Sequence, residues 1–162
     1  MITEDYVSFE TAKLLKAKGF NEFCPTFYET DEPEPDNGPR YSKKLGWFLH
    51  NSYDYSDRYG KMIISAPTLQ MAMKWLRKVH HILVVPDYIY ECTDTSWVYK
   101  IYRLGENGKP ERNAIIGTSY DSNGNPTQHT VGYRDYDVSK QEYTTRTEAV
   151  EEGIKYCLEN LI

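Results

Sequence analysis

The stretch Ala66–Pro86, APTLQMAMKWLRKVHHILVVP, holds the strongest helix signal of the chain and runs directly into its most apolar segment. Pro67 suits the first helical position, because the fixed φ and missing N–H of proline cost nothing there. The run Ile82–Val85 predicts a buried strand, which Pro86 stops or bends. A helix followed by a strand is therefore expected at the packing centre of the fold.

Apolar residues cover an unusually wide arc of this predicted helix. A surface helix needs an apolar stripe of about 100°. Here two neighbouring patches together exceed that width, so we expect a sheet and another helix to cover the helix on two sides. The two patches consist of Leu69, Ala72, Met73, Leu76 and Val79, and of Met71, Trp75 and Ile82. The remaining arc carries a basic stripe, Lys74, Arg77 and Lys78.

Two further helices are expected, one near each end of the chain. Ser8 is a good N-cap for the first, and Gly19 suits the left-handed position after its end. Thr145-x-x-Glu148 fits a capping box at the start of the last helix. Gly153 costs about 1 kcal/mol inside that helix relative to alanine. We therefore expect another backbone to approach closely at Gly153.

Strand signals dominate between Pro86 and the last helix. Aromatic and β-branched residues mark several segments as strands, and Asn123-Gly124 is a strong hairpin signal. The second of these segments is expected to pair antiparallel with the third. The fold class is therefore α+β, an antiparallel sheet of about four to five strands with three helices, N-terminal, central and C-terminal. The strand segments are Tyr88–Cys92, Trp97–Leu104, Arg112–Tyr120 and Gln128–Val138.

Length and composition indicate one domain over residues 1–162. Thr30–Pro39 is an acidic, proline-rich loop. The net charge of −5 weighs against general polyanion binding. Three scattered cysteines favour free thiols in a reducing cytoplasm. The opening does not resemble a signal peptide, and no apolar run approaches the ~20 residues of a membrane span. A cytoplasmic protein without membrane contact is expected.

Three blocks resemble a family of small hypothetical proteins of gut Bacteroides-type bacteria and of their phages and mobile elements. They are YVSFETAKLLKAKGF near the start, APTLQMAMKWLRKVH in the middle and EAVEEGIKYCLENLI at the end. The resemblance covers under a third of the chain. It implies a phage or mobile-element setting in a bacterial cytoplasm, and it carries no activity over to this chain.

Metal and catalytic motifs are weak. His80 and His81 are adjacent, so on a helix they point about 100° apart and cannot share one ion. A core histidine and a surface histidine are expected instead. Asp121-x-Asn123-x-Asn125 begins like a calcium loop, but Pro126 stands where that loop requires glycine, which favours a hairpin turn. With no nucleophile elbow or phosphate-binding loop, no catalytic residue, metal or cofactor is predicted.

The segment Asn51–Gly60 is the best candidate for recognition. Tyrosine, serine and aspartate on a loop are typical of protein-binding surfaces, although the same rings could cover the sheet. The predicted binding residues are Trp47, Tyr53, Tyr55 and Tyr59.

The expected function is therefore that of a noncatalytic binding or accessory protein with a protein partner. One alternative is a DNA-binding accessory protein that uses Lys74, Arg77 and Lys78. Another is a small enzyme with a pocket that gathers distant polar residues such as His50, His80 and His129. The sequence does not specify an oligomeric state.

Overall fold

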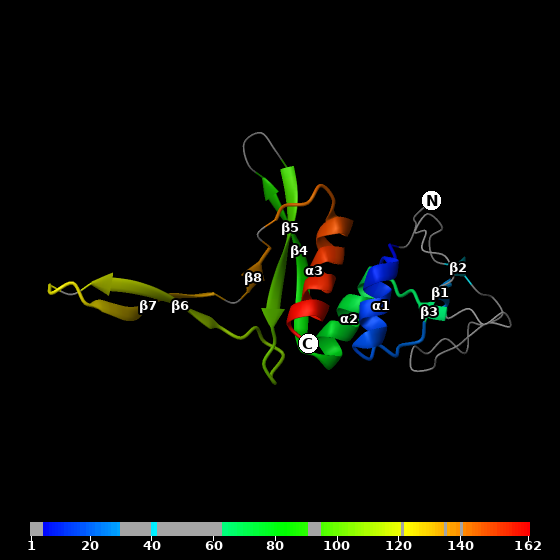
Figure 1. Cartoon of the computed structure of the whole chain (residues 1–162), viewed down its shortest axis with the longest axis horizontal. Coiled ribbons are helices and arrows are strands. Elements are labelled where there is room, and N and C mark those ends of the chain that lie inside the picture. The colour runs from blue at the N-terminus through cyan, green and yellow to red at the C-terminus, as the bar shows by residue number, and fades with distance from the viewer. Residues whose placement is uncertain are drawn as a thin grey trace.

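The computed structural model of the chain describes residues 5–29, 40–41, 63–90, 95–120, 122–134, 136–139 and 141–162. Helices and strands are both present in these segments, so the α+β class is confirmed (Figure 1). The helices are α1 (Phe9–Ala17), α2 (Leu69–Val79) and α3 (Arg146–Asn160). The strands are β1 (Thr26–Glu29), β2 (Arg40–Tyr41), β3 (Ile63–Ser65), β4 (Ile82–Tyr90), β5 (Thr95–Arg103), β6 (Asn113–Tyr120), β7 (Pro126–Arg134) and β8 (Asp137–Val138).

The strands form three antiparallel sheets, with the orders β2-β1-β3, β4-β5-β8 and β6-β7. The single sheet of about four to five strands is therefore not found among the described residues. The predicted pairing of Arg112–Tyr120 with Trp97–Leu104 is also wrong. β5 pairs with β4 on one edge and with β8 on the other, so neither edge is left for β6. The predicted Asn-Gly hairpin is confirmed, since β6 pairs with β7.

Pro86 neither stops nor bends the strand that contains it. β4 continues through Pro86 to Tyr90, and Pro86 lies opposite Tyr99 in the register with β5. The strand continues through the proline because β4 lies at the edge of its sheet. Proline is tolerated on an edge strand, where its missing N–H removes no ladder hydrogen bond.

α2 is covered on two sides, as its wide apolar arc predicts, by β4 and by α3. Its N-cap is Thr68, whose hydroxyl accepts from the backbone N–H of Met71 at 3.2 Å. Pro67 therefore precedes the cap, and its predicted place at the first helical position is wrong. Val79 is 53% exposed, because it is the last residue of the helix, beyond the part that the other elements cover.

α1 begins and ends as predicted. The hydroxyl of Ser8 accepts from the N–H of Thr11. At the other end Gly19 has a φ of +85°, a conformation that glycine adopts without strain. The N–H of Phe20 donates to the carbonyl of Leu15 at 2.9 Å, and that of Gly19 to Lys16 at 3.1 Å, which is the Schellman pattern.

The main core joins the three helices to β3, β4 and β5. α3 packs against both β4 and β5. Gly153 permits this contact, because a Cβ there would lie 2.8 Å from Val84 Cγ1 and 3.0 Å from Tyr99 Cγ. The close approach expected at Gly153 is therefore made by side chains of the sheet and not by a second backbone.

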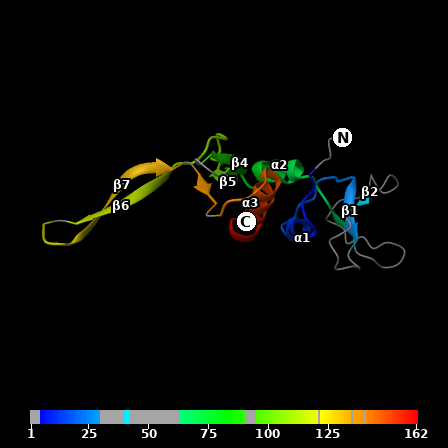
Figure 2. The same cartoon turned by 90° about the horizontal axis from the view of Figure 1, so that it is seen from above.

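The β6–β7 hairpin extends away from the helices as an arm, which Figures 1 and 2 show from two directions. Several sequence predictions lie outside the described residues. These are the acidic loop Thr30–Pro39, the binding residues Trp47, Tyr53, Tyr55 and Tyr59, and His50.

Candidate functional site

A groove lined by tyrosine and acidic side chains lies between α3 and the β5–β8 side of the sheet β4-β5-β8. It begins with the short segment that leads into α3. β8 pairs with β5, and beyond it the backbones of Tyr143 and Trp97 exchange hydrogen bonds of 2.7 Å and 2.8 Å. This chain path holds Tyr143 beside Tyr99 of β5.

The capping box then starts α3 two residues after Tyr143. Thr145 accepts from the backbone of Glu148 at 3.2 Å, and the Glu148 carboxylate accepts from the backbone of Thr145 at 3.1 Å. The helix buries one face against the core. Its other side carries Glu152, Tyr156 and Glu159 along the groove.

Three tyrosine rings form the aromatic wall. Tyr99 stacks on Tyr143 with ring centroids 6.0 Å apart, and Tyr156 lies 6.1 Å from Tyr99 on the helix side. Tyr99 is buried, whereas Tyr156 is 40% exposed. The aromatic wall therefore extends from the core to the surface, and its outermost ring, that of Tyr156, is accessible to a ligand.

The hydroxyls of Tyr99 and Tyr143 stay protonated at neutral pH. Burial raises the pKa of Tyr99 to about 12, and the neighbouring Tyr143 and Tyr156 add to the rise. Burial and the nearby Glu152 carboxylate also raise the pKa of Tyr143. With raised pKa values, the hydroxyls of Tyr99 and Tyr143 remain hydrogen-bonding groups at neutral pH.

Carboxylates dominate the polar part of the groove. The groove has a volume of about 400 Å³ and adjoins a second hollow of about 470 Å³, with which it shares Gln141, Tyr143 and Glu152. Lys155 is the basic residue of the lining, and it lies 3.9 Å from the Glu152 carboxylate. The acidic residues of the two hollows are Asp137, Glu142, Glu148, Glu151, Glu152 and Glu159.

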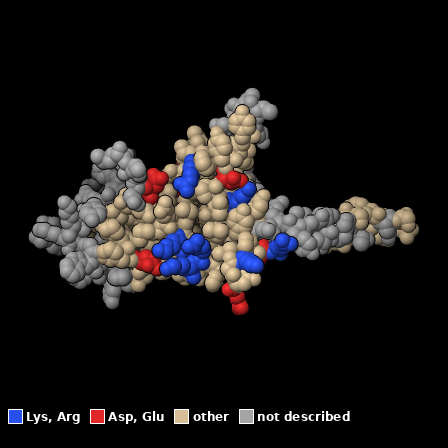
Figure 3. Space-filling view, turned by 180° about the vertical axis from the view of Figure 1, so that it is seen from behind, with Lys and Arg blue, Asp and Glu red and all other residues tan. Residues whose placement is uncertain are grey.

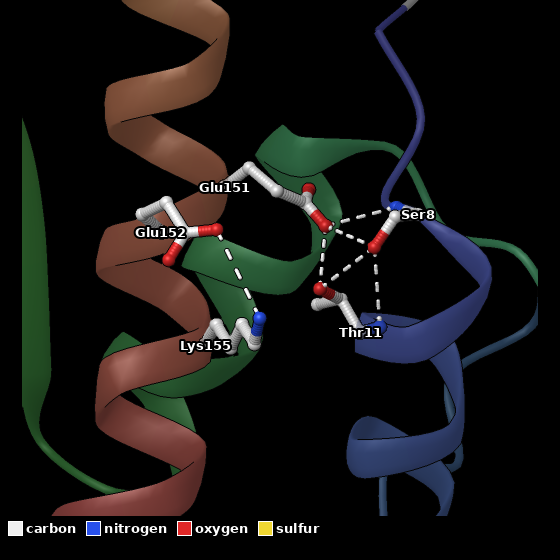
Figure 4. A network of polar contacts seen from close by, with 5 residues as sticks. All are labelled: Ser8, Thr11, Glu151, Glu152 and Lys155. Carbon is white, nitrogen blue, oxygen red and sulfur yellow. Dashed lines mark hydrogen bonds and ion pairs between the residues drawn. The ribbon is translucent and has the colours of Figure 1, made fainter. Parts of the chain in front are cut away.

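The Glu151 carboxylate accepts hydrogen bonds from the start of α1. Figure 4 shows its carboxylate pointing to the first turn of α1, while Glu152 of the next position points to Lys155. The hydroxyls of Ser8 and Thr11 donate to Glu151 Oε1. The Glu148 carboxylate belongs to the capping box, and that of Glu142 accepts from the hydroxyl of Ser96. Asp137, Glu152 and Glu159 leave the groove acidic. A cation is attracted both to carboxylates and to the face of an aromatic ring.

The predicted basic stripe is exposed. Lys74, Arg77 and Lys78 all lie on the solvent side of α2, and Figure 3 shows lysine and arginine side chains gathered over the body of the molecule. The stripe lines none of the hollows described above.

Of the two adjacent histidines, His81 is at the surface as predicted, but His80 is half-buried and is not the hydrogen-bonded core histidine that was expected. His81 is exposed, with a φ of +56°, and His80 packs its ring on Trp75 at 4.6 Å. His80 Nε2 is buried and has no hydrogen-bond partner among the described residues. Burial, followed by the charges of His81 and Lys18, lowers the pKa of His80. His80 lines none of the described hollows.

The described residues contain no group of three or more histidine, cysteine or acidic side chains placed to hold a metal ion. Nor do they include a helix long and apolar enough to cross a membrane. Of the segment Asp121–Asn125, which begins like a calcium loop, the described residues 122–125 belong to the turn between β6 and β7.

Sequence reasoning missed the groove because its tyrosines come from three separate segments. The only local signal was the polar side of α3, where Glu148, Glu152, Tyr156 and Glu159 recur at helical spacing. Comparison of the chain with family models, with curated proteins and with solved structures finds no match.

Proposed function

We propose that this protein is a noncatalytic binding protein, and that the groove along α3 recognises a basic segment of a protein partner. The supporting observation is the combination of stacked tyrosines with an excess of carboxylates in one hollow of about 400 Å³. Tyrosine is enriched at protein interfaces because it joins a large apolar ring to a polar tip. A lysine or arginine side chain would meet rings and carboxylates together.

The proposal includes the setting expected from the sequence. We place the protein in the cytoplasm, where Cys24 and Cys157 would remain the free, buried thiols that the structure has. Burial raises the pKa of both to about 12, so neither is a reactive thiolate. We also propose that the protein belongs to the phage or mobile-element setting that the resemblance implies.

A labelled peptide rich in lysine and arginine tests the groove. Fluorescence anisotropy is expected to show binding to the wild-type chain and none of comparable strength for a glutamate-rich peptide. The double variant Glu152→Gln/Glu159→Gln removes two carboxylates and leaves Lys155 unbalanced, so its affinity should fall at least about tenfold.

The matched control is Glu22→Gln/Glu106→Gln, which changes the net charge equally at exposed positions outside the groove. It should bind like the wild type apart from a small loss of long-range attraction. Equal affinity of the two double variants, or no binding of the basic peptide by the wild type, contradicts a cation-binding groove.

A second candidate function is that of a nucleic-acid accessory protein, favoured by the exposure of Lys74, Arg77 and Lys78. Phosphate contacts by these side chains would make binding strongly salt-dependent. Gel shifts that disappear on charge reversal of the stripe support this function. The absence of any shift at low salt removes it.

A further inference from the structure

The β6–β7 hairpin is a two-stranded sheet with no third strand beside it among the described residues. β6 and β7 pair with each other, and neither belongs to another sheet of the described chain. No described helix packs extensively on either strand, and both views show the hairpin reaching away from the body (Figures 1 and 2). An isolated two-stranded hairpin is marginally stable in water, and a third strand is the usual remedy.

The two outer edges of this hairpin are unequally protected. Proteins protect exposed edges with charged side chains, prolines and bulges. β7 begins at Pro126, and the register shift between Ile115 and Ile116 places an extra residue in β7. β6, with the sequence NAIIGTSY, has no proline and no charged residue. The edge of β6 is therefore the one open to strand addition.

We propose that β6 pairs antiparallel with β6 of a second copy of this chain, which gives a four-stranded sheet in the order β7-β6-β6-β7. Antiparallel pairing of identical strands is self-complementary about a twofold axis. Every open N–H and C=O group of one edge then meets its equivalent in the other copy. Each hairpin thereby gains the further strands that its stability requires.

Charge favours a second copy as the occupant. Between Asn113 and Arg134 the charged residues are Asp121 and Arg134, which cancel, so the net charge of −5 belongs to the rest of the chain. Two neutral hairpins can approach without repulsion. β6 has eight residues and at ~3.4 Å each spans about 27 Å, so the two acidic bodies lie at opposite ends, well beyond the ~8 Å Debye length.

The test compares Thr118→Lys with Gln128→Lys in the full chain by sedimentation velocity over a wide range of concentration. Thr118 of β6 and Gln128 of β7 are register partners and both are exposed. The two variants therefore place the same charge at the same height, one strand apart. The wild type should dimerise, Thr118→Lys should weaken the dimer about tenfold, and Gln128→Lys should change it little.

A charge of the opposite sign at the same position gives a second comparison. Thr118→Glu should weaken the dimer as Thr118→Lys does, because either charge lies beside the edge that strand addition covers. A wild-type chain that is monomeric at every concentration overturns the proposal. So does a dimer weakened more by Gln128→Lys than by Thr118→Lys.

Discussion

The Oε1 atom of Glu151 accepts hydrogen bonds from both the backbone N–H and the hydroxyl of Ser8, at 2.9 Å and 2.7 Å. A carboxylate of α3 thus occupies the N-terminus of α1, where unpaired N–H groups and the helix dipole favour negative charge. The hydroxyl of Thr11, which is fully buried, donates to the same atom. Glu151 therefore fixes the packing of the first helix on the last.

Glu151→Ala should destabilise the protein by about 1–3 kcal/mol, because it leaves the buried hydroxyl of Thr11 without its acceptor. Urea unfolding measures the loss. Glu152→Ala is the matched control one residue along, since Glu152 forms a surface ion pair with Lys155, and such pairs contribute about 0–1 kcal/mol. Equal losses in the two variants would show that Glu151 does not hold α1 on α3.

Gly153→Ala should lower the melting temperature even though alanine is the better helix former. The added Cβ would lie 2.8 Å from Val84 Cγ1, so α3 or the sheet must move. Overpacking costs about 1–3 kcal/mol, which exceeds the ~1 kcal/mol gained in helix propensity. Thermal unfolding measures the balance. An unchanged or higher melting temperature would contradict the close packing of α3 on β4 and β5.

Gly19→Ala should destabilise for a different reason. Among the described residues, no atom outside the adjoining ones lies within 4 Å of a Cβ at this position, but its φ of +85° is strained for any residue with a side chain. A loss of about 1 kcal/mol is expected from this backbone strain. Gly19→Asn should lose less, because asparagine tolerates the left-handed region better. Equal losses for alanine and asparagine would point to a steric cause.

His80 should make the protein less stable in mild acid. Because its pKa in the folded protein lies below the ordinary 6.5, the unfolded chain binds the proton more readily. The contribution of His80 is fully present above pH 6.5 and is lost as the pH falls through 6.5 towards the lowered value. His80→Phe, which can keep the ring contact with Trp75, should therefore lose less melting temperature across that range. Parallel pH profiles for the two proteins would contradict this assignment.

The helices could be predicted because their signals are local. Ser8, Gly19 and Thr145 act within a few residues of where they stand, and each has its predicted role. The wide apolar arc of α2 also predicted its two-sided cover correctly. The prediction for Pro67 misplaced the start of the helix, because several neighbouring residues could serve as its N-cap.

Apart from the β6–β7 hairpin, the sheets could not be predicted, because pairing depends on which edges are already occupied. β8, Asp137–Val138, lies at the end of the predicted strand Gln128–Val138 and has no signal of its own, yet it takes an edge of β5 that was expected for β6. Likewise, Pro86 is compatible with a strand only because β4 lies at an edge. Edge and centre are properties of the assembled sheet and not of a segment.

The groove escaped prediction for the same reason. Tyr99, Tyr143 and Tyr156 meet only after β5, the segment following β8 and α3 have packed together. The exposure of Lys74, Arg77 and Lys78, in contrast, follows from helical periodicity alone and was predicted correctly.

The hydrogen bonds between Ser8 and Glu151 join residues 143 positions apart in the chain. During synthesis the N-terminal segment leaves the ribosome first, so α1 emerges long before the carboxylate that completes its first turn. Nine residues are too few for a helix that is stable in water by itself. α1 therefore gains its contacts with α3 only after that helix has been translated, whereas β3, which also packs on α1, is available much earlier.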